Sequence, residues 1–101
     1  MVPLNDKDNG RTIEVTLNDV IIVRLNENPT TGHRWTVVAA QGLDQVESNF
    51  EPGKAVGAPG VRAFQFRAAL PGSHELRLKN RREWEDELGA STQFEARIIV
   101  K

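Results

Sequence analysis

The chain has 101 residues, 39% of them apolar, which suits one domain built around one modest core. Its 13 basic and 14 acidic residues leave a net charge of −1, so charge does not draw the chain towards nucleic acid or an anionic membrane. Cysteine is absent, which excludes disulfides, thiolate metal ligands and a cysteine nucleophile. No apolar stretch approaches the roughly 20 residues that span a bilayer. The opening MVPLNDKDNG lacks the features of a signal peptide, so we expect a periplasmic or secreted location only if a leader has been removed.

Apolar and polar residues alternate along most of the chain, which predicts β-strands rather than helices. In the first strand, Ile13, Val15 and Leu17 are expected to share one face. A short edge strand is also expected over 2–4, before a polar turn. The main strands are expected over residues 11–17, 20–25, 33–39, 46–50, 62–68, 73–79 and 93–101. Seven to eight strands in about 100 residues predict a single all-β domain over 1–101, an immunoglobulin-like antiparallel β-sandwich.

If successive strands alternate in direction, every second connection lies at the same end of the sandwich. The connections expected at one end are short and plain, at 18–19, 40–45 and 71–72. Those at the other end are longer and read NENPTTG, EPGKAVGAPG and NRREWEDELGAS. Because loops on a rigid sandwich commonly carry recognition residues, we expect the functional site at this second end.

The first of these loops contains the run NPTTG at 28–32. Pro29 fixes its own φ and pushes Asn28 towards an extended backbone, while Gly32 permits a positive φ. Thr30 and Thr31 are β-branched and stiff at χ1. These residues predict a narrow, stiff, uncharged loop tip, although by composition alone they also fit an ordinary turn.

The second and third loops each carry one notable feature. GAPG at 57–60 has two glycines whose bare backbone another chain could approach closely, and a plain flexible loop fits these residues equally well. Trp84 stands among polar and charged residues in NRREWEDE, as an exposed binding anchor would. The alternative is a Trp84 folded back over the edge of the sandwich. Trp35, followed by Thr36 and Val37, is expected in the core.

Catalytic chemistry has little support in the sequence. His33 and His74 are far apart and lack metal-ligand spacing. The chain contains no G-x-S-x-G or comparable nucleophile motif. We therefore expect a protein that is not an enzyme and needs no cofactor or metal.

Taken together, the three loops are more specific than any one of them. NPTTGHRW, then GAPGVRAFQF, then Arg82-Glu83-Trp84 resemble, in order and spacing, the motifs of the chagasin family of cysteine-peptidase inhibitors. The resemblance runs from about Asn9 to the end of the chain. It implies an immunoglobulin-like sandwich that inhibits papain-like cysteine peptidases reversibly and tightly, by inserting three loops into the active-site cleft.

The resemblance also implies a role for each loop. The central loop would place Thr31 beside the catalytic cysteine and histidine of the enzyme, the second loop would lie along the non-primed side, and the third would cover the primed side. The residues implied to bind the peptidase are Asn28, Pro29, Thr30, Thr31, Gly32, Gly57, Ala58, Pro59, Gly60, Arg82 and Trp84. Glu83 departs from the family, which usually has Pro at this position. We expect a monomer, and the open alternative is an adhesion or ligand-binding module that uses the same loops for another partner.

Overall fold

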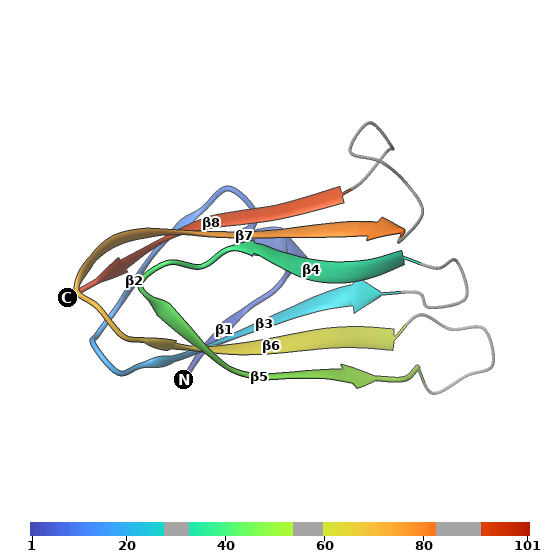
Figure 1. Cartoon of the computed structure of the whole chain (residues 1–101), viewed down its shortest axis with the longest axis horizontal. Helices are drawn as coiled ribbons and strands as arrows, with labels where there is room; N and C mark the ends of the chain where they lie inside the picture. Colours follow the sequence, from blue (N-terminus) through green and yellow to red (C-terminus); the bar gives the residue numbers. More distant parts are fainter. Residues whose placement is uncertain (28–32, 54–59, 83–91) are drawn as a thin grey trace.

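The computed structural model describes residues 1–27, 33–53, 60–82 and 92–101. Within these residues the chain forms eight strands in two four-stranded sheets that pack face to face (Figure 1). One sheet has the order β1 (Val2–Leu4), β3 (Val20–Glu27), β6 (Gly60–Ala68), β5 (Leu43–Glu51). The other has the order β2 (Thr12–Val15), β8 (Thr92–Val100), β7 (Gly72–Arg82), β4 (His33–Ala39). The predicted sandwich is therefore confirmed. None of the helical segments in the described ranges has the length and apolar character of a membrane span.

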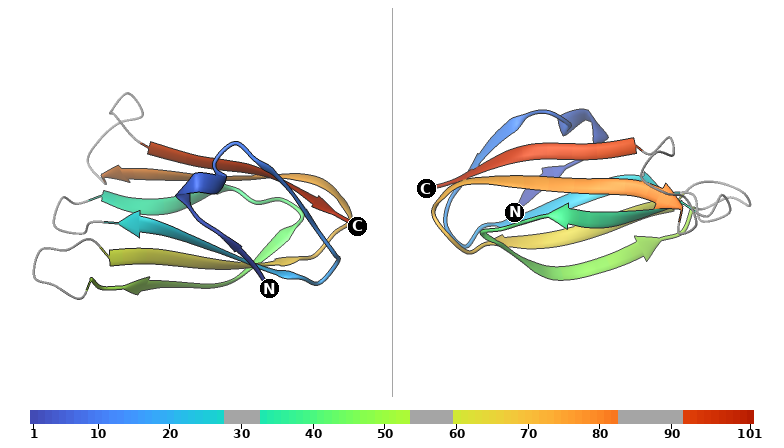
Figure 2. Two further views of the ribbon diagram at one scale, coloured as in Figure 1. Left: turned by 180° about the vertical axis from the view of Figure 1, so that it is seen from behind. Right: turned by 45° about the horizontal axis from the view of Figure 1, so that its top comes forward.

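The first two strands depart from the predicted antiparallel pattern. β1 pairs parallel with β3, and β2 pairs parallel with β8, so both sheets are mixed. Between them the chain makes a 3-10 turn at Asp6–Asp8, capped by Asn5, whose side chain accepts from the Lys7 N–H at 2.9 Å. Figure 2 shows this blue segment leaving β1 and entering β2. The N-terminal chain thus extends one sheet and then crosses to the edge of the other.

The apolar residues of the alternating pattern fill the space between the two sheets. Phe64, Phe66 and Trp35 are buried, as the pattern predicts. The core consists of Leu4, Val15, Ile21, Val23, Leu25, Trp35, Leu43, Phe64, Phe66, Ala68, Leu76, Leu78, Phe94, Ala96, Ile98 and Val100. The prediction for Leu17 was wrong, since its side chain is 38% exposed. The alternation stops because β2 ends at Val15 and the chain turns.

Two edge strands, β4 and β5, each carry a β-bulge at an exposed valine. The pairing register shifts between Val37 and Ala39 in β4 and between Gln45 and Glu47 in β5. The extra residues, Val38 and Val46, are 51% and 58% exposed. Bulges interrupt the row of free backbone groups on an edge, which protects the sheet against pairing with another chain.

Candidate functional site

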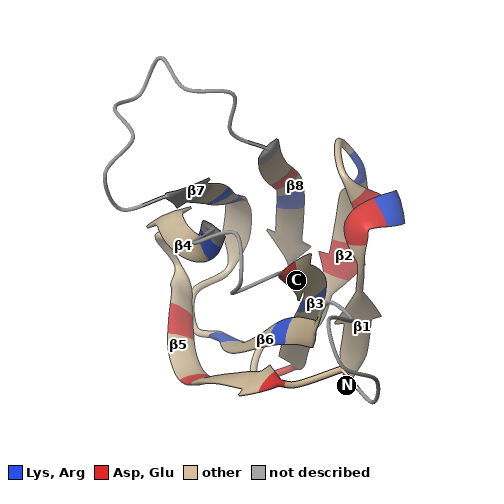
Figure 3. Cartoon of the chain, turned by 90° about the vertical axis from the view of Figure 1, so that its right-hand side faces the viewer, with Lys and Arg blue, Asp and Glu red and all other residues tan. Residues whose placement is uncertain are grey.

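Most of the predicted binding residues lie outside the described part of the chain. These are Asn28, Pro29, Thr30, Thr31, Gly32, Gly57, Ala58, Pro59 and Trp84. Gly60 and Arg82 are described as the first residue of β6 and the last residue of β7. What the structure shows of the site is therefore the set of strand ends that flank the three loops. Figure 3 looks onto this end of the sandwich.

The pairing register brings the strand ends of the three loops together. The central loop leaves β3 at Glu27, which pairs with Gly60, where the second loop ends. It enters β4 at His33, which pairs with Arg82, where the third loop begins. The two strand ends of the central loop are therefore paired with a strand end of the second loop in one sheet and with a strand end of the third loop in the other. The prediction that these three connections start from one end of the sandwich is confirmed by their strand ends (Figure 1).

The third loop begins next to β4. Among the described residues, β7 and β8 pair from Gly72 and Val100 to Asn80 and Thr92. The last two residues of β7, Arg81 and Arg82, also pair with β4. β7 therefore brings the start of the third loop beside β4, which carries the end of the central loop.

A buried carboxylate lies at the base of the central loop. Among the described residues, Glu27 is the only polar or charged residue that is buried, with 2% of its surface exposed. Its Oε1 accepts the backbone N–H of Trp35 at 2.7 Å, which joins β3 to β4 across the two sheets. Its Oε2 accepts from Nε and a terminal nitrogen of Arg62 at 3.1 Å and 2.8 Å. The carboxylate thus connects β3, β4 and β6 at one point.

Trp35 completes this connection from the other sheet. Its side chain is 8% exposed, and its indole Nε1 donates to the carbonyl oxygen of Asn26 at 2.8 Å. Trp35 therefore bonds to two successive residues at the end of β3, once through its backbone and once through its ring. Together, these bonds hold the two strands that the central loop joins.

Gly60 is constrained by its own chain. A Cβ built there would lie 2.3 Å from Cζ of Phe50 and 2.5 Å from the carbonyl oxygen of Glu51, closer than real Cβ contacts. The guanidinium carbon of Arg62 lies 5.2 Å from the centre of the Phe50 ring, a cation–π arrangement. The sequence suggested a bare backbone open to another chain, whereas in the described structure Phe50 and Glu51 occupy the space beside Gly60.

Sequence reasoning missed Glu27 and Arg62, although a signal was present. Glu27 continues the inward positions Ile21, Val23 and Leu25, so simple alternation places a carboxylate in the core. Arg62 likewise continues the inward-facing series of Phe64 and Phe66. Two opposite charges on inward faces of strands at the same end predict a buried ion pair.

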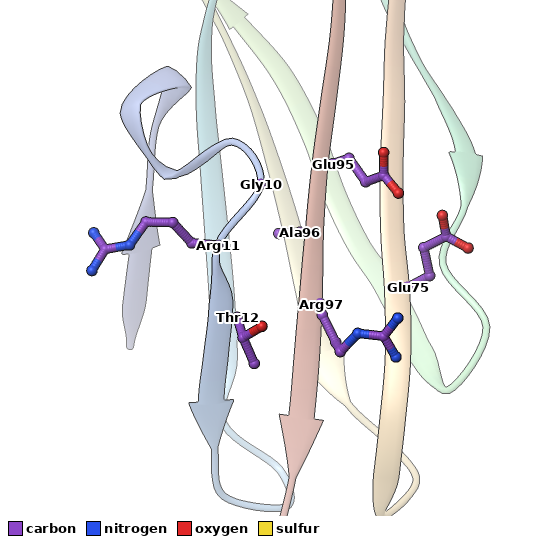
Figure 4. A pocket seen from close by; sticks show the side chains of 7 residues that line it. All are labelled: Gly10, Arg11, Thr12, Glu75, Glu95, Ala96 and Arg97. Carbon is purple, nitrogen blue, oxygen red and sulfur yellow. The ribbon is translucent and has the colours of Figure 1, made fainter.

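Two hollows lie elsewhere on the described surface. One, of about 200 Å³, is shown in Figure 4 and is lined by Gly10, Arg11, Thr12, Glu75, Glu95, Ala96 and Arg97. Its charged groups already have partners, since Arg97 bonds Ser73 at 3.0 Å and Arg77 pairs with both glutamates. The other, of about 370 Å³, is lined by residues 38–41 and 73–75. Across the described ranges, no group of three acidic or histidine side chains is arranged to hold a metal ion.

The comparisons with known proteins agree with this geometry. Amoebiasin-2 of Entamoeba histolytica is 28% identical over 87 residues, which cover 81% of this chain and 71% of that protein. Chagasin of Trypanosoma cruzi is 29% identical over 84 residues, covering 75% of this chain and 76% of chagasin. The crystal structure of the cysteine protease inhibitor EhICP2 from Entamoeba histolytica superposes with a TM-score of 0.87 at 21% identity, over 99% of this chain and 95% of that one.

The fold and the register define an immunoglobulin-like sandwich with three loops based at one end. The model of the chagasin family peptidase inhibitor I42 matches residues 14–98, a range that contains all three loops. The chain belongs to the chagasin family of peptidase inhibitors. The resemblance seen in the loop motifs is thereby confirmed, as is the prediction that the protein is an inhibitor and not an enzyme.

Proposed function

We propose that the protein inhibits papain-family cysteine peptidases by inserting its three loops as a wedge into the active-site cleft. One observation carries the arrangement of the wedge, namely the register that pairs Glu27 with Gly60 and His33 with Arg82. This register supports a central position for the 28–32 loop, with one neighbouring loop on each side. Membership of the chagasin family supports the class of target.

Each loop has a distinct role in this proposal. Thr31 of the central loop, supported by Asn28, Pro29, Thr30 and Gly32, reaches the catalytic cysteine and histidine of the enzyme. The stretch of Gly57, Ala58 and Pro59 lies along the non-primed side of the cleft through backbone contacts, with Gly60 as its anchored end. Arg82 and Trp84 cover the primed side, where the indole packs on the enzyme surface.

Such a wedge blocks the enzyme without being cut. Loops that fill the cleft but present no peptide bond in line with the nucleophile block the site and are not cleaved. Protease–inhibitor interfaces bury roughly 800 Å² per partner, an area that three short loops can supply. Stiff loops on a rigid sandwich lose little entropy on docking, so more of the contact energy appears as affinity.

Titration of papain with the purified protein tests the class of function. The proposal predicts loss of activity on a peptide substrate with a one-to-one end point, recovery of activity on dilution, and an intact inhibitor band after prolonged incubation. Papain that keeps its full activity in excess protein would leave the adhesion or ligand-binding alternative standing. A cleaved inhibitor would instead identify a substrate.

Substitution at the loop tip tests the role of the central loop. Thr31→Asp should weaken inhibition severely, because the cleft would have to desolvate a carboxylate. The melting temperature should hardly change, since a loop substitution away from packing usually alters stability by under about 0.5 kcal/mol. Thr36→Asp is the matched control, because Thr36 is exposed on β4 and lies opposite Lys79. Equal inhibition constants for the two variants would refute the central-loop assignment.

A further inference from the structure

We infer that Glu27, with Arg62 as its partner, is a positioning residue that sets the geometry of the central and second loops for inhibition. The inference rests on the proposed function and adds two residues that the loop motifs do not contain. Neither residue needs to touch the peptidase. Their action is exerted through the strand ends from which the loops start.

The first step concerns the two ends of the central loop. Glu27 directly precedes the loop, and Trp35 follows its end on β4. β3 and β4 belong to different sheets and are not hydrogen-bonded neighbours in either, so no strand ladder fixes their separation. Two bonds do so instead, from Trp35 N to Glu27 Oε1 at 2.7 Å and from Trp35 Nε1 to the Asn26 carbonyl at 2.8 Å. One of the two bonds that set the span of the central loop therefore runs through the Glu27 carboxylate.

The second step connects the carboxylate to the second loop. Arg62, with 20% of its side chain exposed, donates to Glu27 Oε2 and lies over the ring of Phe50. Phe50 in turn packs against Gly60, the residue at which β6 begins. Contacts thus run without interruption from the end of the second loop to the base of the central loop.

The third step concerns the chemistry of the group. A buried carboxylate costs desolvation energy, and replacing a buried ion pair with apolar residues often leaves stability unchanged or improves it. An apolar residue at position 27 would simply continue the series Ile21, Val23 and Leu25. The Glu27 carboxylate accepts from the Trp35 N–H and from Arg62 at once, which no apolar side chain can do. The pair is therefore better explained by the geometry that it imposes than by a gain in stability.

A double substitution separates geometry from stability. Glu27→Met together with Arg62→Met removes the polar connection without leaving an unpaired buried charge. Because the buried Trp35 N–H loses its acceptor, the melting temperature should fall, by an amount comparable with a core truncation such as Val100→Ala. Its inhibition constant for papain should rise by about tenfold or more, mainly through faster dissociation, as for other buried polar pairs. The Trp35 amide should also exchange its hydrogen faster, because it loses its acceptor.

Two matched variants serve as controls. Asp44→Met with Arg67→Met removes another Arg–carboxylate pair of β6, at the opposite end of the sandwich, and should leave inhibition unchanged. Val100→Ala truncates the core at that same far end and measures how far lost stability alone affects inhibition. Glu27→Gln retains an acceptor for the Trp35 N–H but loses the charged bond to Arg62, so its inhibition constant should rise, though by less than in the double-Met variant.

The outcomes distinguish this inference from the proposed function. Wild-type protein that fails to inhibit papain overturns the function, and the inference with it. Wild-type protein that inhibits, with a folded double-Met variant that inhibits equally well, overturns the inference alone. If the double-Met variant does not fold, Arg62→Lys decides, because it keeps the charge but loses the forked bonding geometry of Arg62. Inhibition by Arg62→Lys that matches wild type then assigns the pair to stability, and inhibition weakened more than in Val100→Ala supports positioning.

Discussion

At the scale of single residues, Gly60 shows how the end of a loop is determined by packing beneath it. Its missing side chain makes room for the Phe50 ring and the Glu51 carbonyl, and the ring in turn lies against Arg62. The residue thus has a structural requirement that does not depend on any partner.

Gly60→Ala should destabilise the protein by about 1–3 kcal/mol, the usual cost of inserting a methyl group into a packed site. For a domain of this size, each kcal/mol lowers the melting temperature by about 4–8 °C. Adding Phe50→Val to Gly60→Ala should recover only part of the loss, because the Glu51 carbonyl still lies 2.5 Å from the new Cβ. Thermal unfolding of both variants checks this. An unchanged midpoint for Gly60→Ala would contradict the packing described.

Glu83 is the residue at which the third loop departs from its family. Pro at this position would fix its own φ and steer Arg82 away from the helical region, whereas Glu imposes neither restraint. Glu83→Pro should therefore tighten the complex by roughly two- to fivefold, equivalent to about 0.4–1 kcal/mol of recovered entropy. The gain should appear mainly as a slower dissociation rate from papain.

Glu83→Gln is the control for charge in that experiment. Weaker binding by Glu83→Pro alone would mean that the native loop does not adopt the conformation of the family. Equally weaker binding by both variants would mean that Glu83 makes a charged contact with the peptidase and contributes to specificity.

At the scale of elements, the N-terminal strands close the sandwich. β1 is three residues long and lies at the edge of its sheet, yet it delivers the buried side chain of Leu4 to the core. Because β1 pairs parallel with β3 and β2 pairs parallel with β8, the N-terminal segment adds one strand to each sheet.

Leu4→Ala should lower stability by about 2–5 kcal/mol, as for other buried leucines, if β1 is an integral part of the core. Pro3→Ala is the matched control, because Pro3 is exposed on the same strand and should change stability by under about 0.5 kcal/mol. Urea unfolding of the two variants gives the comparison. Equal midpoints would mean that β1 is dispensable.

At the scale of the whole molecule, stability and inhibition are assigned to different regions. The core fills the space between the two sheets, while the proposed binding residues follow the strand ends at one end. Among the described residues, the group of Glu27, Trp35 and Arg62 connects the two regions.

The two tryptophans test this separation. Trp35→Ala removes a buried ring and should cost about 3–5 kcal/mol of stability, seen as a large fall in the melting temperature. Trp84→Ala should leave the melting temperature nearly unchanged and weaken papain binding by on the order of 2 kcal/mol, roughly 30-fold. Both quantities should be measured for both variants. A large loss of stability in Trp84→Ala would place this ring in the core instead.

The sequence by itself determined the strands and the family. Alternation places the strands because side chains of a strand point to opposite faces, so Phe64 and Phe66 are marked as core by spacing alone. The rule fails at Leu17, which is exposed because the strand has ended and the chain turns there. The family could be recognised because the characteristic residues of its loops form short continuous sequence motifs, such as NPTTG.

Only the tertiary structure decided which strand ends lie together and what holds them. Positions far apart in the sequence are joined by the parallel pairing of β1 with β3 and of β2 with β8. The same is true of the backbone pairs Glu27–Gly60 and His33–Arg82 and of the bond between Glu27 and Arg62. Glu27 and Arg62 are 35 residues apart, so no local pattern specifies their contact. The contact forms because β3 and β6 pair antiparallel in a register that sets Arg62 opposite Leu25 and Gly60 opposite Glu27, and that register is set by burial of the whole core.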